Sequence, residues 1–296
     1  MTLKKKIGVS FLLTVLILSF GFALGVSAKE IERNDLNYFI SVKDKNIWNY
    51  HGVELYLGDK YISENAYLIQ DTTYVPLRSV STLAGAGVAF DDKSRTAYIT
   101  TQGFSMTVSE GAYIIMANER PIMSYAPAVI LSDNRMYVPV RSIAKALSLS
   151  VEWRQTRQVV LSGTPTPLLH ADKYYNTDDV YWLSRIISAE SRGEMLLGQV
   201  AVGNVVLNRM RHADYPNTIW GVIFDKKYGV QFSPVANGSI YFAPSYNSVL
   251  AAKICLEGVS VSDRVLFFME PNKSTSSWIY KNRPYAFSIG NHYFFY

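Results

Sequence analysis

A duplicated segment in the first half of the chain most strongly constrains its fold. The seven residues Tyr74–Val80 (YVPLRSV) return 63 residues later as Tyr137–Ile143 (YVPVRSI). Downstream, Val88–Phe90 matches Val151–Trp153 at the same offset, so the register holds without a gap. A fixed offset between two similar strings is the mark of a duplicated structural unit.

Each copy alternates extended and helical patterns. An extended start, Val53–Leu57 in the first copy and Tyr113–Met116 in the second, leads through a polar turn to the Tyr-Val-Pro string. An amphipathic helix follows, Leu77–Ala84 or Val140–Leu147, and then a hairpin. Proline suits the point where a strand enters a helix, because its missing N–H costs nothing there. The pattern predicts two small α+β units, at about residues 50–110 and 111–163.

These repeats resemble the copper amine oxidase N-terminal-like domains. The resemblance implies that residues 50–163 are a non-catalytic spacer or wall-binding stalk. His51 stands alone, so the segment has no histidine cluster for copper. For the repeated arginines, Arg78 and Arg141, a structural hydrogen bond or ion pair is the favoured interpretation, and a ligand contact is the alternative.

Both ends of this region adjoin segments of different character. Lys4–Lys6 precede an uncharged run, Ile7–Ala28, which ends in small residues. This predicts an export signal peptide over residues 1–28, with an uncleaved membrane anchor as the alternative. A linker is expected over residues 29–49. The string Thr164–Pro167 (TPTP) predicts a second, stiff linker over residues 164–176. We therefore expect an exported protein.

Composition excludes several classes of protein. With 49% hydrophobic and 18% charged residues, the chain is globular rather than disordered. The net charge is +5, but three of these positive charges are Lys4–Lys6, so nucleic acid is not an expected partner. Cys255 is the single cysteine, which rules out an intramolecular disulfide and a thiolate metal cluster.

A helix in the last third places a glutamate among apolar side chains. Leu183, Ile186, Ile187 and Glu190 fall at i, i+3, i+4 and i+7, on one helical face. Thr177 can cap this helix, Gly193 ends it, and Met195–Met210 predicts a second, mostly buried helix.

Two interpretations of Glu190 remain open from this pattern. It could be a structural acid paired with Arg185, Arg192 or Arg209. Alternatively, burial without full pairing would raise the pKa of its carboxyl group, as a general acid near neutral pH requires.

Residues 177–296 contain a series of short strings: AESRGE (189–194), GQVAVGNVVLNR (198–209), YPNTIWGVI (215–223), QFSPV (231–235) with Asn237-Gly238, Phe267-Phe268, Trp278, and IGNHYF (289–294). Together these strings resemble the SleB/CwlJ family of spore cortex-lytic and cell wall hydrolases. Two departures stand out: Met195 replaces a usual proline, and Glu270 replaces a usual asparagine.

The resemblance implies an α+β, lysozyme- or transglycosylase-like catalytic domain that cleaves the glycan backbone of peptidoglycan, possibly of the spore cortex, without cofactor or metal. Glu190 matches the family's catalytic glutamate. A lytic transglycosylase can work with one carboxylate, because the C6 hydroxyl of muramic acid attacks intramolecularly. The expected substrate-binding residues are Glu194, Gln231, Phe232, Ser233, Asn237, Trp278 and Tyr280. For Glu194, a structural or substrate-orienting role is favoured over that of catalytic base.

Other chemistries remain as alternatives. Within the same class these are a muramidase, a glucosaminidase or an amidase that cuts the muramoyl peptide, and outside it a wall-binding protein without activity. A zinc amidase finds little support, because His212 and His292 have no H-E-x-x-H spacing. A peptidase pair of Cys255 and His292 is disfavoured, because the residues around Cys255 predict an apolar helix.

Overall fold

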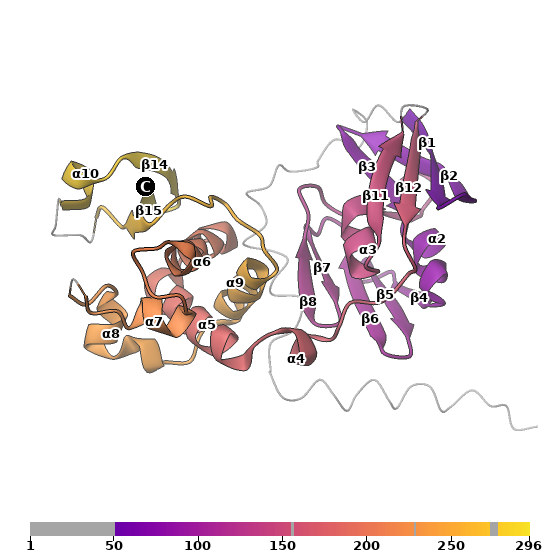
Figure 1. Ribbon diagram of the computed structural model, residues 1–296. Helices are drawn as coiled ribbons and strands as arrows, with labels where there is room; N and C mark the ends of the chain where they lie inside the picture. Colours follow the sequence, from indigo (N-terminus) through magenta and orange to yellow (C-terminus); the bar gives the residue numbers. More distant parts are fainter. Residues whose placement is uncertain (1–50, 155–156, 228, 273–277) are drawn as a thin grey trace, which may run out of the picture.

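The computed structural model describes residues 51–154, 157–227, 229–272 and 278–296. The expected signal peptide and the linker 29–49 lie outside the described residues. Figure 1 shows a β-rich N-terminal domain beside a mostly helical C-terminal domain that ends in a small sheet. Within the described part of the chain, no helix has the length and apolar character needed to cross a bilayer.

Two sheets and two short helices build the N-terminal domain. The first sheet has the strand order β11-β12-β1-β2-β3-β10-β9, and the second runs β4-β5-β6-β7-β8. The bounds are β1 (His51–Leu57), β2 (Lys60–Ile69), β3 (Thr72–Pro76), α2 (Leu77–Ser81), β4 (Gly87–Asp91), β5 (Thr96–Thr101), β6 (Phe104–Ser109), β7 (Ile114–Ala117), β8 (Arg120–Met123), β9 (Val129–Ile130), β10 (Met136–Pro139), α3 (Val140–Ala146), β11 (Ser150–Arg154) and β12 (Gln158–Ser162).

The α+β class is confirmed, but the two copies do not fold as separate units. Strand β1 of the first copy pairs in parallel with β12 of the second, and β3 pairs with β10. In the other sheet, β4 and β5 of the first copy join β7 and β8 of the second through β6. One hydrophobic cluster contains buried side chains from both copies, such as Leu55 and Leu161. The two repeats therefore share their sheets and their hydrophobic core, and neither copy closes a core with its own strands alone.

The repeated string forms a strand end and a helix start, as predicted. Pro76 and Pro139 stand immediately before α2 and α3, with φ values of −62° and −55° that suit the proline ring. A 3-10 turn, Thr82–Ala84, extends α2 over the predicted length.

Three helices enclose the core of the C-terminal domain. They are α5 (Thr177–Ser191), α6 (Leu196–Arg211) and α9 (Tyr246–Leu256). The short helices α7 (Ile219–Ile223) and α8 (Ser233–Asn237) lie between α6 and α9, and α10 (Trp278–Asn282) follows β13. A small sheet of order β13-β15-β14 completes the domain, with β13 (Phe267–Met269), β14 (Tyr285–Ile289) and β15 (His292–Phe295).

The three core helices approach each other closely at Gly203. A Cβ atom at this position would lie 2.7 Å from Sγ of Cys255 on α9 and 2.8 Å from Cδ1 of Ile187 on α5. Both side chains are buried. The absence of a side chain at Gly203 therefore sets the spacing of α6 against its two neighbours.

We expect Gly203→Ala to destabilise the protein by about 1–3 kcal/mol, the usual cost of overpacking a core. Thermal unfolding would measure the loss. Gly193→Ala is the matched control, because a Cβ atom there meets nothing within 4 Å. An equally stable Gly203→Ala protein would contradict this account of the helix packing.

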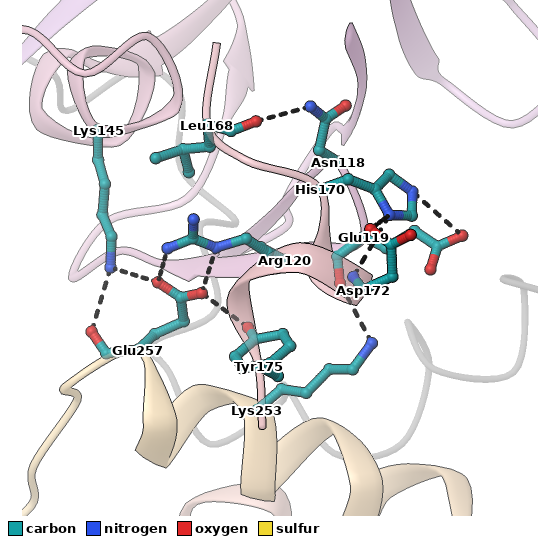
Figure 2. A network of polar contacts seen from close by, with 10 residues as sticks. All are labelled: Asn118, Glu119, Arg120, Lys145, Leu168, His170, Asp172, Tyr175, Lys253 and Glu257. Atoms are coloured by element: carbon teal, nitrogen blue, oxygen red, sulfur yellow. Dashed lines mark hydrogen bonds and ion pairs between the residues drawn. The ribbon is translucent and has the colours of Figure 1, made fainter. Parts of the chain in front are cut away.

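A buried ion pair joins the two domains (Figure 2). Glu257, one residue beyond α9, accepts hydrogen bonds from Nε and Nη2 of Arg120 on β8, at 2.7 and 3.0 Å. It also accepts from the Tyr175 hydroxyl at 2.7 Å and pairs with Nζ of Lys145 on α3 at 3.1 Å. The Arg120 and Glu257 side chains are 5% and 1% exposed. Around them, Ile114 and other apolar side chains of β7 and β8 pack on the C-terminal core.

The linker 164–176 runs along the N-terminal domain. The amide of Thr166 donates to the carbonyl of Leu147, and Asn118 donates through Nδ2 to the carbonyl of Leu168. The linker ends in a short helix, α4 (Ala171–Tyr174). Hydrogen bonds to neighbouring residues thus add to the stiffness that its prolines give.

Candidate active site

Helix α5 places Glu190 one residue before its C-terminal end. The helix is capped by Asn176, whose Oδ1 accepts from the amides of Asp178 and Asp179 at 2.9 and 3.2 Å. Thr177, the predicted cap, is instead the first helical residue, because Asn176 has the extended backbone that a cap requires. The predicted apolar face is confirmed: Leu183, for example, is fully buried.

Glu190 lines an open groove with a volume of about 940 Å³. The side chain is only partly exposed, and no arginine of the described residues forms an ion pair with it. The groove is lined by Ala189, Glu190, Arg209, Val230, Gln231, Phe232, Ser233, Ala236, Phe267, Phe268, Met269, Glu270, Trp278, Ile279 and His292. The sequence left two interpretations of Glu190 open, a structural acid paired with arginine and a general acid. This arrangement favours the general acid.

Burial controls the charge state of Glu190. Loss of hydration raises the pKa of its carboxyl group to about 7, while the positive charge of Arg209 on α6 acts in the opposite direction. The Arg209 guanidinium itself is buried, donates from Nε to the carbonyl of Leu266 at 2.7 Å, and lies over the rings of Phe232 and Phe267. A carboxyl group with this pKa can both donate and accept a proton near neutral pH.

Four of the predicted substrate-binding residues line the groove with Glu190: Gln231, Phe232, Ser233 and Trp278. Ser233 is exposed at the start of α8, and Trp278 is half-exposed at the start of α10. Phe232 is only 2% exposed and forms part of the core, so its ring packs more against protein than it faces the cleft.

The other three predicted residues do not line this groove. Glu194 binds the turn between β14 and β15. Its carboxylate oxygens accept hydrogen bonds from Nδ2 and from the backbone amide of Asn291, at 2.8 and 3.1 Å. Oδ1 of Asn237 accepts from the Ser239 amide at the end of α8. Tyr280 packs edge-on against Phe295 of the small sheet. The contacts of Glu194 agree with the structural role favoured for it, and a substrate contact by any of the three residues stays a prediction.

The structure adds groove residues that sequence reasoning did not select. Arg209 was considered as a partner of Glu190, and His292 as a zinc ligand or a partner of Cys255, but neither as a residue of the groove. Glu270 lines the groove at the position that departs from the family pattern. One feature of the sequence could have identified Arg209, His292 and Glu270: all three lie in or beside the strings that carry the family resemblance.

Residues considered for other chemistries are placed elsewhere. Cys255 lies in the apolar helix α9, and burial raises the pKa of its thiol to about 12, which makes a reactive thiolate unfavourable. Among the described residues there is no group of three or more histidine, cysteine, aspartate or glutamate side chains arranged to hold a metal ion.

Comparison with known families agrees with this division of the chain. Residues 193–295 match the family model described as Cell Wall Hydrolase, and residues 56–162 match the Copper amine oxidase N-terminal domain. The C-terminal domain therefore belongs to the cell wall hydrolase family, and the chain also contains a copper amine oxidase N-terminal domain.

Several curated proteins similar to this domain are named spore cortex-lytic enzymes. One from Bacillus cereus is 38% identical over 120 residues, which is 40% of this chain and 45% of that protein. One from Oceanobacillus iheyensis is 35% identical over 129 residues, covering 44% of this chain and 45% of that protein. The chain thus spans less than half the length of these curated relatives.

Among solved structures, the chain is similar to the catalytic domain of the germination-specific lytic transglycosylase SleB from Bacillus anthracis. The two are 38% identical, and the match covers 41% of this chain and 97% of that domain, with a TM-score of 0.38.

Proposed function

We propose that this protein cleaves the glycan backbone of peptidoglycan, with Glu190 as general acid and base. One observation carries the proposal: a carboxyl group with a pKa of about 7 faces an open groove in a domain of the cell wall hydrolase family. The cortex of the spore is the proposed form of the substrate, because the relatives are named spore cortex-lytic enzymes.

The reaction begins with proton transfer. Protonated Glu190 donates its proton to the bridging oxygen while the glycosidic bond breaks, which leaves an oxocarbenium-like sugar. The resulting carboxylate then takes a proton from the C6 hydroxyl of the muramic acid residue as that oxygen closes on the anomeric carbon. The product is a 1,6-anhydro sugar, and Glu190 returns to its protonated state.

A second carboxylate in the groove favours a hydrolytic alternative. Glu270 lines the same groove as Glu190, and two carboxylates are what an ordinary glycosidase uses. In that case a water molecule replaces the C6 hydroxyl as nucleophile and Glu270 acts as its base. An amidase, or a wall-binding protein without activity, is a further alternative that the product analysis below separates.

Mass spectrometry of digested sacculi tests the proposal. We expect muropeptides with anhydro-muramic ends, which only intramolecular attack produces. Reducing ends would instead support hydrolysis with Glu270, and free stem peptides would indicate amidase action. Absence of any released product from both vegetative and cortex peptidoglycan would contradict the enzymatic proposal.

The pKa of Glu190 predicts the alkaline side of the pH profile. Because the acid must be protonated, kcat/KM should be highest below pH 7 and fall about tenfold for each further unit above the pKa of about 7.

Replacing Arg209 with methionine removes a positive charge near Glu190, so the fall in kcat/KM should move to higher pH. Arg211→Met, at the exposed end of the same helix, is the matched control and should leave this fall at the same pH.

The N-terminal domain is proposed to hold the enzyme on the wall. None of the described residues of this domain lines the Glu190 groove. Its proposed contribution is therefore to attachment and not to the cleavage step. A secreted protein associated with the wall or spore envelope is the corresponding location. Fractionation of cells and spores with an antibody to the chain would test it.

A further inference from the structure

A second groove lies in the N-terminal domain, with a volume of about 680 Å³. The N-terminal residues of α3, the edge strand β11 and the segment after β8 contribute to it. Two exposed aromatic rings line it: Trp153 is 46% exposed and Tyr125 is 97% exposed. Exposed aromatic rings within a groove offer apolar faces on which a ligand can pack.

Hydrogen-bond donors and acceptors line the same groove as these rings. Arg141 is exposed and forms no ion pair among the described residues, and the Ser142 hydroxyl lines the groove beside it. Asp71 and Thr73, which also line the groove, carry acceptor oxygens. A flat apolar face with hydrogen-bonding groups at its edge suits a sugar ring, and a free guanidinium suits a carboxylate.

Arg141 belongs to the repeated string, for which the sequence left a ligand contact as the less favoured interpretation. Its place in the groove now favours that alternative. The buried arginine of this domain, Arg120, already has Glu257 as its partner, whereas Arg141 faces the groove without one.

The groove also adjoins the junction between domains. Lys145 lines the groove and pairs with Glu257, whose other partners fix β8 against the C-terminal domain. Figure 2 shows this lysine reaching from α3 to the end of α9. The second groove therefore has a fixed position relative to Glu190.

We propose that this groove binds peptidoglycan, with a sugar ring on Trp153 and a carboxylate of the muramyl peptide at Arg141. The proposal rests on the proposed function, because it takes the same polymer as ligand. One stretch of wall occupies the groove while another lies against Glu190, and the two contacts raise the effective concentration of substrate at the catalytic groove.

Fluorine NMR of the full chain labelled with 5-fluorotryptophan separates the two sites. Trp153 reports the second groove and Trp278 reports the Glu190 groove. Trp220 is half-exposed and lines neither groove, which makes it the internal control. A Glu190→Gln background keeps the probe intact, and each signal is assigned from a Trp→Phe variant.

The probe is a soluble disaccharide tetrapeptide prepared from peptidoglycan, with chitotetraose and the free tetrapeptide as separate arms. We expect the disaccharide tetrapeptide to shift the Trp153 signal in a saturable way and to leave Trp220 unchanged. Arg141→Ala should weaken this response at least about tenfold, a difference of about 1.4 kcal/mol. Arg135→Ala, an exposed arginine outside the groove, should not weaken it.

Each failure has its own signature. If Trp278 responds and Trp153 does not, the second groove is not a peptidoglycan site and the proposed function stands. If Trp153 responds and Trp278 does not, the second groove is supported and the catalytic assignment fails. A Trp153 response that is equal for chitotetraose and unchanged in Arg141→Ala would overturn the carboxylate contact.

Discussion

Glu190→Gln is expected to lower the rate of peptidoglycan cleavage by at least about a hundredfold, the low end for removal of a general acid. Glutamine keeps the size of the side chain but has no proton to give to the leaving oxygen. Release of muropeptides from purified sacculi measures the effect. A variant that clears a sacculus suspension as fast as the parent would overturn the role of Glu190.

Two controls distinguish lost chemistry from lost structure. Because burial raises the pKa of Glu190, its ionised form costs the folded protein stability, and this cost grows as pH rises above the unfolded value near 4.5. Glu190→Gln should therefore unfold at or above the parent temperature at pH 8. Glu270→Gln is the chemical control: it retains activity if one carboxylate suffices, and loses it if Glu270 is the base for water.

The second large effect is expected at the junction between domains. Glu257→Gln leaves the buried Arg120 guanidinium without a countercharge, and breaking such a pair typically costs about 3–5 kcal/mol. Calorimetry of the full chain should show a lower transition temperature, with the two domains unfolding separately. Glu110→Gln is the matched control. It breaks the Arg95 pair, whose side chains are 45% and 23% exposed, and should cost less than about 1 kcal/mol.

The same network predicts a pH dependence. Burial alone would raise the pKa of Glu257, but hydrogen bonds from Arg120, Tyr175 and Lys145 hold it below its ordinary value. The carboxylate thus stabilises the junction fully above the unfolded value near 4.5, and this contribution is lost as pH falls through the folded pKa. Equal stability of Glu257→Gln and Glu110→Gln across this range would contradict the assignment.

Local patterns in the sequence predicted local structure well. The spacing of Leu183, Ile186, Ile187 and Glu190 places these side chains on one face in any α-helix, so helix α5 and its buried face followed from periodicity alone. The strand–helix transition at Pro76 and Pro139 followed from the restricted backbone of proline. Family resemblance, rather than periodicity, was what singled out Glu190 from other acids.

Long-range pairing was beyond this reasoning. A repeat shows that two segments form similar elements, but it does not show whether β12 pairs with its own copy or with β1 of the other. The partner of Glu257 lies 137 residues away in sequence, and no pattern around either residue signals the contact. The contact between Glu194 and Asn291 was hidden for the same reason, because the two residues become neighbours only when the hairpin of β14 and β15 forms.

Because both sheets of the N-terminal domain contain strands from both copies, the length of this domain cannot change by one copy at a time. Deleting either copy would remove strands that pair with the other copy in both sheets, so we expect that a single copy does not fold by itself. We therefore expect that this domain can be shortened only by removing both copies together, because a single copy would leave half a core and unpaired strand edges.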